Sequence, residues 1–413
     1  MNKSKKLKIC VLGSTYPRSQ NDHQVPWLRE TVNQLRGRGH DVTVAASAFK
    51  GSRHHMIDGV QVLRFRYAPA FIEALTHDEG APAKSKTILG KLLAILYILS
   101  GIVHMLHWSR KHDFDVINVH WPFPHALFTI LPRALFGTKV VVTAHGAGMA
   151  MARQSKYVKL ILGFVLSHSD SITCNSSHTK SEITRLTGAT AQVIPYGATV
   201  EAKQAGRPFS RPRTRVLFSG RHIQRKGVGY LIEALSLVLK QRKDVELVIT
   251  GHGDRTEEWK QIVTNLKLED KVSFEGFVSN QRLAELYQSS DIYCLPAIHD
   301  DNSDTEGLGV VLIEALLHAR PVIASGVGGI VDVIKHQETG ILVKEKSSND
   351  LAHALIYLIE NPLRARELGE AGQKFVNNNF SWSTISDSLE RVLIRATEQR
   401  DLFGTELQMA GVV

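Results

Sequence analysis

Short apolar, β-branched runs alternate with helical stretches along almost the entire chain. In the first half the strand-like runs are residues 8–12, 42–46, 60–66, 116–119, 140–143, 171–175 and 192–195. Two helical stretches between them, at residues 25–37 and 125–136, are the clearest. Strands separated by crossover helices predict a parallel, doubly wound sheet, and hence the α/β class.

The alternation lapses at residues 201–215 and then begins again. The lapse is polar, positively charged and contains Pro and Gly, as expected for a linker. After it, helical stretches separate strand-like runs at 215–219, 246–250, 272–275, 292–295, 321–324 and 341–343. We therefore expect two Rossmann-like domains, residues 1–200 and 215–380, joined by a linker at 201–214. Residues 381–413 form the C-terminal segment, with a final helix at about 383–400.

Composition narrows the class of protein. The 413 residues are 43% hydrophobic and 22% charged, which excludes a collagen-like, coiled-coil or wholly disordered chain. A net charge of +10 favours anionic partners: nucleic acid, an acidic membrane or phosphate-bearing small molecules. No basic stripe alternates with aromatic residues, so we expect no nucleic-acid binding. Three distant cysteines, Cys10, Cys174 and Cys294, indicate reduced thiols in a cytosolic protein.

Residues 88–108 form the most apolar stretch of the chain. Within it, the fifteen residues from Leu92 to Leu106 are nearly all apolar, whereas a spanning helix needs about 20. Two interpretations stay open: a helix buried in the core, and a helix lying in the plane of a membrane surface. Basic flanking residues favour contact with anionic lipid; they are Lys84, Lys86, Lys91, Arg110 and Lys111. The short apolar run at 7–12 predicts a buried strand rather than a signal peptide.

The strongest local pattern is a pair of glutamates eight residues apart, Glu306 and Glu314, around a predicted helix start. Gly307 and Gly309, on either side of Leu308, let the backbone turn tightly, so the helix N-terminus presents free N–H groups to an anion. With a phosphate on those groups, Glu314 could reach a neighbouring diol and Glu306 the group beyond the phosphate. The alternative is an ordinary capped helix with a solvated Glu314.

A second pattern follows the first strand of the second half. Gly220, Arg221, Lys226 and Gly227 belong to a basic, glycine-punctuated loop at the carboxyl end of that strand. A diphosphate there would use both a fork-shaped donor and a point charge, which Arg and Lys supply. A solvated basic loop is the alternative interpretation.

Two weaker patterns lie at the ends of later strands. Gly251 and Gly253 fit a loop that passes a nucleotide. Phe277 and Val278 could lie beside a base.

In the first half, histidines stand at the ends of two predicted strands. His145 is a natural acid/base or substrate-contact group near neutral pH. His120 and Trp121 end another strand and could line an acceptor cleft. The spacing of the histidines predicts no metal site.

Taken together, these segments resemble the retaining glycosyltransferases of family 4 (glycosyl transferases group 1), whose GT-B fold has two Rossmann-like domains facing across a cleft. The resemblance covers almost the whole chain and is densest in the second half. Its motifs occur in the family's order at residues 219–221, 226–227, 251–253, 276–278, 306 with 314, 320–324, 328–329 and 380–382. The resemblance also implies that the last helix crosses back onto the first domain.

The resemblance implies a role for each candidate residue. Glu306 would contact the donor sugar and Glu314 the ribose hydroxyls, while Arg221 and Lys226 would hold the diphosphate. His145 would correspond to the family's acceptor-domain histidine near the sugar. Arg, Lys and helix amides take the place of a divalent ion, so no metal or cofactor is expected beside the UDP- or GDP-linked donor.

One departure concerns the loop after the first strand. Many members of the family carry a Gly-Gly pair there, near the donor phosphates. This chain has Gly13, a candidate donor-binding residue, followed by residues 14–22 without such a pair. How closely this loop's backbone approaches the phosphate is therefore open.

The resemblance implies a metal-independent, retaining hexosyltransferase of polysaccharide or glycoconjugate biosynthesis. Its acceptor would be a glycan or a lipid-linked saccharide. We expect a cytoplasmic protein, with peripheral contact on the inner, anionic face of the membrane left open. Two other functions also stay open: a GT-B relative such as a sugar-nucleotide epimerase or a phosphorylase, and a non-catalytic scaffold. The intact set Arg221, Lys226, Glu306 and Glu314 favours transfer.

Overall fold

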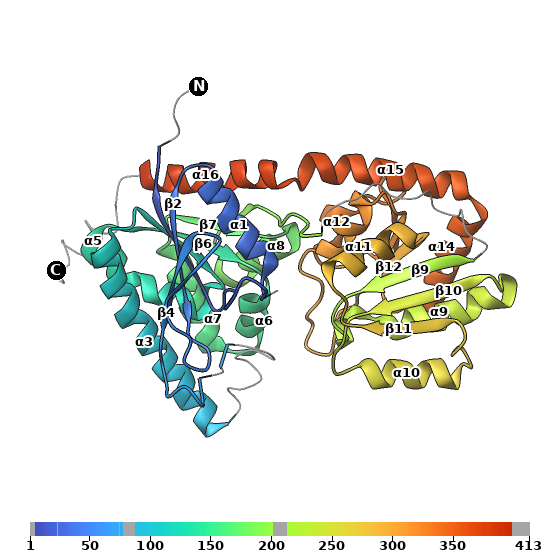
Figure 1. Ribbon diagram of the computed structural model, residues 1–413, viewed down its shortest axis with the longest axis horizontal. Helices are drawn as coiled ribbons and strands as arrows, with labels where there is room; N and C mark the ends of the chain where they lie inside the picture. Colours follow the sequence, from blue (N-terminus) through green and yellow to red (C-terminus); the bar gives the residue numbers. More distant parts are fainter. Residues whose placement is uncertain (1–4, 23, 74, 77–86, 201–212, 399–413) are drawn as a thin grey trace. The chain divides into compact units, whose positions relative to one another are not determined.

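The computed structural model of the chain describes residues 5–22, 24–73, 75–76, 87–200 and 213–398 (Figure 1). The predicted linker falls mostly at 201–212, outside the described residues, as do Lys84 and Lys86. The chain forms two compact units. Unit 1 comprises Met1–Asn175, Thr179–Ile194 and the chain from Ile385 onward, and unit 2 comprises Ser176–His178 and Pro195–Thr384.

Unit 1 is built on an eight-stranded sheet with the order β3-β4-β2-β1-β5-β6-β7-β8. The strands are β1 Lys8–Gly13, β2 Asp41–Ser47, β3 His55–Ile57, β4 Val60–Phe65, β5 Val116–His120, β6 Lys139–Ala144, β7 Ser171–Cys174 and β8 Gln192–Val193. All pairs are parallel except β3 with β4. The central strands β1, β2, β5 and β6 are buried on both faces apart from the first residues of β1 and β2, which explains their continuous apolar sequences. The predicted doubly wound α/β sheet is confirmed.

The β3–β4 hairpin was not predicted, although the sequence carries its signal. Asp58 and Gly59 form the two-residue turn, with φ of 51° and 72°. Positive φ at both central positions is typical of the tight hairpin turn that Asp-Gly favours.

The helices of unit 1 differ from the prediction in one place. They are α1 Pro26–Gly37, α3 Ile88–His112, α4 Pro122–His125, η1 Ala126–Thr129, α5 Ile130–Phe136, α6 Ala147–Gln154, α7 Lys156–Ser167 and α8 Ser177–Thr187. The single helix expected at 125–136 is therefore broken into α4, η1 and α5. Proline is tolerated only in the first turn of a helix, so Pro132 requires a new helix to begin near Ile130.

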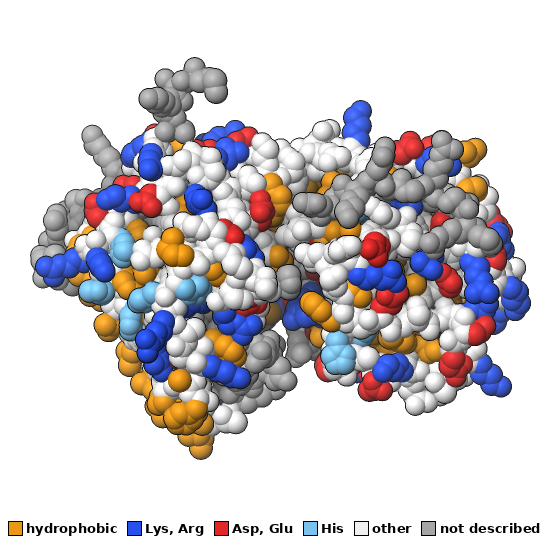
Figure 2. All heavy atoms as spheres, viewed as in Figure 1, with side chains coloured by type: hydrophobic (Ala, Val, Ile, Leu, Met, Phe, Trp, Pro, Cys, Tyr) orange, Lys and Arg blue, Asp and Glu red, His pale blue; other side chains and the backbone are white. Residues whose placement is uncertain are grey.

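Helix α3 is packed on one face and exposed on the other. Gly101 lies so close to η1 that an added Cβ would be 2.3 Å from the Phe128 ring. The large apolar side chains that α3 exposes are Ile88, Leu89, Leu92, Ile95, Leu96, Leu99 and Val103. Figure 2 shows hydrophobic side chains gathered over this helix. A fully buried core helix is therefore the wrong interpretation. Among the described residues, α3 alone has the length and apolar composition to cross a membrane, and only 28% of its most apolar window is buried.

Unit 2 contains a six-stranded parallel sheet with the order β11-β10-β9-β12-β13-β14. Its strands are β9 Thr214–Ser219, β10 Val245–Thr250, β11 Val272–Gly276, β12 Ile292–Leu295, β13 Val322–Ser325 and β14 Ile341–Val343. Its helices are η2 Gln224–Lys226, α9 Val228–Gln241, α10 Thr256–Asn265, α11 Asn280–Ser289, α12 Val310–Leu317, α13 Ile330–Val333, α14 Ser348–Glu360 and α15 Pro362–Asn379. Helix α9 packs against α14 and α10, and α12 packs against α15.

The last helix, α16 (Trp382–Glu398), belongs to unit 1 from Ile385 onward. Glu390 on this helix accepts from Arg38 at 2.9 Å and pairs with His40 at 3.1 Å. His40 Nδ1 accepts from the Leu7 amide, so its Nε2 carries the proton given to Glu390. These contacts attach α16 to the start of the unit 1 sheet.

The glycine contact of α3 can be tested by comparing two alanine substitutions. Gly101→Ala should lower the free energy of unfolding by about 1–3 kcal/mol, because its Cβ would overlap Phe128. Gly163→Ala on α7 is the matched control: its Cβ meets nothing within 4 Å, so the stability should rise by about 0.5–1 kcal/mol. Urea unfolding of both variants gives the two values. Equal effects in both would show that α3 does not pack on η1 through Gly101.

Candidate functional site

The sheet order of unit 2 reverses direction between β9 and β12, and ligands of doubly wound folds bind at such a point. The loops after β9 and β10 meet there, backbone against backbone. A Cβ on Gly251 would lie 1.9 Å from the Gly220 carbonyl oxygen, and one on Gly253 would lie 2.3 Å from the His222 carbonyl oxygen. Gly251 also has φ of 107°. These glycines are thus required by loop-to-loop packing, whether or not a ligand passes them.

Lys226 and Glu306 form the centre of the candidate site. Lys226 Nζ lies 2.5 Å from Glu306 Oε2, and the lysine is buried. The lysine ends the short helix η2, after which Gly227 turns with φ of 64°. A Cβ on Gly227 would lie 2.0 Å from the Pro296 carbonyl oxygen, so only glycine brings this loop against the end of β12. The two predicted residues are therefore in direct contact.

Arg225 is a member of this site that the sequence analysis missed. Its guanidinium donates to the Thr305 carbonyl at 2.8 Å and lies 3.6 Å from Glu306 Oε2. The only sequence signal was its place in the basic loop beside Lys226. Arg225 thus ties the η2 loop to the loop before α12.

Arg221 is exposed, and among the described residues no hydrogen bond or ion pair of its side chain is recorded. Its charge nevertheless reaches Glu306. Burial alone would raise the pKa of Glu306, but the charges of Lys226, Arg225 and Arg221 lower it to about 2. Glu306 is therefore an ionised, hydrogen-bond-accepting carboxylate throughout the physiological range.

The loop that carries Glu306 is held from the other side by a glycine pair. Gly329 N–H donates to the Glu306 carbonyl at 2.9 Å. Cβ atoms on Gly328 and Gly329 would lie 2.1 Å from the carbonyl oxygens of Glu306 and Gly307. Gly309 then caps α12 with φ of 84°, and Leu308 beside it is buried. The predicted tight turn into a helix N-terminus is present.

Glu314 is buried inside α12, so the solvated interpretation of this residue is wrong. The Tyr287 hydroxyl donates to Glu314 Oε2 at 3.1 Å, and Thr199 also hydrogen-bonds the carboxyl group. Burial outweighs these bonds and raises the pKa of Glu314 to about 7. Tyr287 also contacts the Ser219 hydroxyl at 3.2 Å, which links Glu314 to the end of β9. No pattern in the sequence singled out Tyr287.

The remaining donor-side candidates lie at the end of β11. Phe277 is 82% exposed and Val278 is half-buried. An exposed aromatic ring after a strand is available to a planar ligand. Asp300, which lies in the loop before Glu306, accepts from the amides of Asn302 and Asp304 and so caps a turn. Within the described chain, no three His, Cys, Asp or Glu residues are grouped closely enough to hold a metal.

In unit 1, Gly13, His120 and His145 stand at the carboxyl ends of the neighbouring strands β1, β5 and β6. His120 Nδ1 and His145 Nε2 are 2.9 Å apart, and the two rings stack with centroids 5.1 Å apart. Trp121 lies 5.1 Å from the His145 ring, and a Cβ on Gly13 would lie 3.2 Å from Trp121. Trp27, which the sequence analysis missed, lies 4.7 Å from His145. The three acceptor-side candidates thus form one aromatic cluster.

A chain of hydrogen bonds sets the proton positions in this cluster. Asn118 Nδ2 donates to the Val141 carbonyl and to Thr143, so its Oδ1 must accept from His120 Nε2, at 3.0 Å. Burial lowers the pKa of His120 to about 3 and that of His145 well below its ordinary value. Neutral His120 therefore accepts at Nδ1 from the Nε2 proton of His145. Both imidazoles are uncharged at pH 7.

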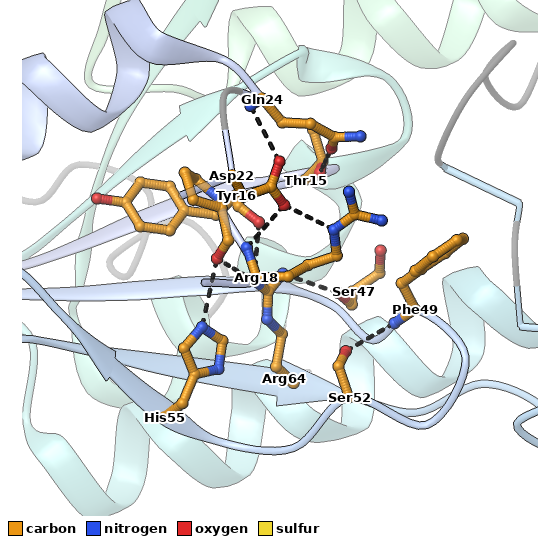
Figure 3. A network of polar contacts seen from close by, with 11 residues as sticks. Thr15, Tyr16, Arg18, Asp22, Gln24, Ser47, Phe49, Ser52, His55 and Arg64 are labelled. Carbon is orange, nitrogen blue, oxygen red and sulfur yellow. Dashed lines mark hydrogen bonds and ion pairs between the residues drawn. The ribbon is translucent and has the colours of Figure 1, made fainter. Parts of the chain in front are cut away.

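The loop after β1, which lacks the Gly-Gly pair, is held by side chains (Figure 3). Buried Arg64 donates to the carbonyls of Tyr16 and Pro17, each at 2.8 Å. Arg18 closes the loop on Asp22 at 2.6 Å. These three contacts, two of them from Arg64 on β4, hold the backbone of the loop after Gly13 in place.

Comparison with known proteins places these features in a family. The family model for glycosyl transferases group 1 matches residues 200–375. The family model for glycosyltransferase family 4 matches residues 26–202. The GDP-mannose-dependent alpha-(1-6)-phosphatidylinositol monomannoside mannosyltransferase of Mycobacterium tuberculosis is 27% identical over 338 residues, which are 78% of this chain and 87% of that protein. The N-acetyl-alpha-D-glucosaminyl L-malate synthase of Bacillus anthracis is 26% identical over 308 residues, 72% of this chain and 78% of that protein.

Solved structures share the fold. A sucrose-phosphate synthase from Thermosynechococcus elongatus has a TM-score of 0.75 at 20% identity. The match covers 94% of this chain and 98% of the synthase chain. Anabaena HepE, in complex with UDP and glucose, has a TM-score of 0.71 at 18% identity. The match covers 94% of this chain and 99% of the HepE chain. The predicted GT-B fold is confirmed.

The buried carboxyl group of Glu314 predicts a pH dependence of stability. Its pKa is about 7 when folded and about 4.5 when unfolded, so folding is penalised as pH rises from about 4.5 through 7. The penalty amounts to about 3 kcal/mol. Glu314→Gln should remove it, so the variant gains stability relative to the native protein between pH 5 and pH 8 in urea unfolding.

Glu306→Gln is the control of opposite sign. It leaves Lys226 buried without its ionic partner, so it should lower stability at neutral pH. If the free energy of unfolding changes with pH in the same way in the native protein and in Glu314→Gln, the assignment of a raised pKa to Glu314 is contradicted.

Proposed function

Because the chain belongs to the group 1 glycosyltransferases and has the GT-B fold, we propose that it transfers a hexose from a nucleoside diphosphate sugar to a lipid-linked acceptor in glycoconjugate synthesis. The transfer retains the anomeric configuration and needs no metal ion. One observation carries this proposal: ionised Glu306 contacts Lys226 and Arg225, with Arg221 nearby, at the start of α12.

The cations suit the donor's leaving group. As the sugar–phosphate bond breaks, negative charge grows on the diphosphate, and a fixed positive field stabilises that charge more in the transition state than in the ground state. Lys226 and Arg225 are already oriented by Glu306 and Thr305, so little reorganisation is needed. Exposed Arg221 is available to the phosphates directly.

The two glutamates suit different parts of the donor. Glu306 is ionised above pH 2 and so accepts hydrogen bonds from sugar hydroxyls but does not protonate the leaving group. Glu314 would accept from the ribose hydroxyls. Because it holds a proton below about pH 7, ribose binding releases that proton, and donor affinity falls as pH drops below 7.

The names of relatives indicate which donors to try first. Two mycobacterial relatives are mannosyltransferases acting on phosphatidylinositol lipids, one of them named as GDP-mannose-dependent. HepE was solved with UDP and glucose. On this basis GDP-mannose is the first donor to test and UDP-glucose the second. Neutral His145 would lie on the acceptor side.

The donor proposal is tested by thermal denaturation with GDP- and UDP-sugars. A donor present at 100 times its Kd should add about 2.7 kcal/mol of stability. With the cognate donor, Arg221→Ala should lower kcat by about 10²–10³, on the scale of losing one preorganised donor of an oxyanion hole. Glu314→Ala should mainly raise the donor KM. Activity should survive EDTA.

The matched control is Arg242→Ala, an arginine at the end of α9 that pairs with Asp244. It should leave kcat and KM unchanged. No stabilisation and no turnover with any nucleotide sugar would refute the donor proposal and favour a non-catalytic scaffold. Native kinetics in Arg221→Ala would refute the place of Arg221 in the donor site. Loss of activity in EDTA with recovery in Mg²⁺ would refute metal independence.

We also propose that unit 1 contacts an anionic membrane through α3. The helix exposes a continuous apolar face, and Lys91, Arg110 and Lys111 at its two ends are exposed as well. An apolar face flanked by cations is typical of helices that lie in the membrane interface. This arrangement supports peripheral binding at the cytoplasmic leaflet, where anionic lipids and lipid-linked acceptors lie.

Liposome flotation tests the membrane proposal. The protein should float with anionic vesicles at low salt and less at high salt, because the cationic contribution is screened. The double variant Ile88→Ser, Leu92→Ser should float less, since it removes exposed apolar area from α3. Leu363→Ser, equally apolar and 72% exposed on α15, is the control and should float normally. A native protein that stays unbound at low salt would disprove membrane contact.

A further inference from the structure

A pocket of about 320 Å³ in unit 1 has no part in the donor site. Its walls come from the middle of α3, from the segment around α4, and from α6. Apolar groups dominate these walls, among them Ala94, Ile98, Phe123, Ala147 and Met151. A volume of this size lies at the lower end of the range of small-molecule pockets, about 300–1,000 Å³.

Three polar side chains in the wall, those of Tyr97, His125 and Thr76, have protein partners. The Tyr97 hydroxyl lies 2.8 Å from His125 Nε2, and His125 Nδ1 lies 2.7 Å from the Trp121 carbonyl oxygen. Thr76 is bonded to Ser47 at 2.7 Å. A water molecule in such a pocket would need two to four polar partners. With these groups satisfied by one another, the pocket favours an apolar occupant.

One wall of the pocket continues into the exposed face of α3. Ala94 and Ile98 line the pocket, and their neighbours in sequence, Ile95 and Leu99, are 56% exposed each. Because residues one position apart on a helix point about 100° apart, the pocket-lining and exposed faces are adjacent. An apolar chain can therefore pass from the exposed face of α3 into the pocket without crossing a polar strip of that helix.

Another part of the wall leads to the acceptor-side cluster. Trp121 lines the pocket, and its ring lies 5.1 Å from that of His145. The pocket thus lies between the histidines expected to meet the acceptor and the apolar surface expected to meet the membrane.

From this arrangement we infer that the pocket binds the hydrocarbon chain of the lipid acceptor, in the segment next to its polar head. The head then lies beside His120 and His145, and the rest of the chain leaves along α3. This inference rests on the proposed function for the identity of the acceptor, but chain binding itself involves no donor and no turnover. The occupant is an unbranched or isoprenoid hydrocarbon; a water-soluble glycan would have no use for the pocket.

Alkyl phosphates below their micelle concentration are the probe. In calorimetric titrations of the full chain with hexyl, octyl, decyl and dodecyl phosphate, each methylene that enters the pocket should raise the affinity roughly fourfold. The gain should level off once the pocket is full. A gain that continues undiminished with chain length, or no saturable binding at all, would overturn the inference.

Two pocket-filling variants and one surface variant locate the binding. Ala94→Phe on α3 and Ala147→Leu on α6 should each lower decyl phosphate affinity at least tenfold. Ile95→Ser, one position from Ala94 on the exposed face, should leave decyl phosphate affinity unchanged while reducing flotation. Native affinity in both filling variants, or loss of affinity in Ile95→Ser alone, would show that the chain lies on the surface and not in the pocket.

The same variants separate this inference from the proposed function. Nucleotide-sugar stabilisation depends on unit 2, so it should be unchanged in Ala94→Phe and Ala147→Leu. If no nucleotide sugar binds the native protein while decyl phosphate binds and the filling variants block it, the donor proposal fails and the chain site stands. If donors bind but alkyl phosphates do not, the chain site fails alone.

Discussion

The buried ion pair between Lys226 and Glu306 is the interaction around which unit 2 is arranged. A charge taken out of water is costly unless its partner stays in place, so both loops must be held accurately. Close backbone contacts do this: Gly227 lies against the Pro296 carbonyl, and Gly328 lies against the Glu306 carbonyl. Arg225 adds a bond from one loop to the other. The three cations Lys226, Arg225 and Arg221 outnumber the single negative charge of Glu306, so this cluster as a whole is a fixed source of positive field before the helix N-terminus.

Unit 1 achieves order at the corresponding strand ends with uncharged groups. Asn118, His120 and His145 form a chain of hydrogen bonds in which each proton position follows from the one before. Burial keeps the pKa of His120 near 3, so no cation forms there at physiological pH. A neutral, aromatic cluster suits hydroxyl groups and sugar rings, whereas the cationic cluster of unit 2 suits phosphates. The clusters at the strand ends of the two units therefore differ in charge.

Helix α3 shows how one segment serves packing, pocket and surface. Gly101 and Ser100, which interrupt the apolar run, attach the helix to its neighbours. Gly101 admits the Phe128 ring of η1, and Ser100 donates to the carbonyl of Arg66, the residue after β4. The neighbouring face lines the acceptor-side pocket, and the third face is exposed. An apolar helix of this kind need not be buried to be stable, because it is anchored by a few close contacts along one edge.

The sequence by itself determined the α/β class, the two sheets and the family, because strand–helix alternation and glycine spacing are local patterns. It also placed Glu306, Lys226, His120 and His145 at strand or helix ends, where parallel topology brings them to one edge of each sheet. Tertiary structure decided everything that depends on contacts distant in sequence. Arg225, Tyr287 and Trp27 join the sites only through packing, and Glu314 has a pKa near 7 only because the fold buries it. The exposure of α3 was likewise undecided, since an apolar helix has the same sequence whether a core or a membrane is to cover it.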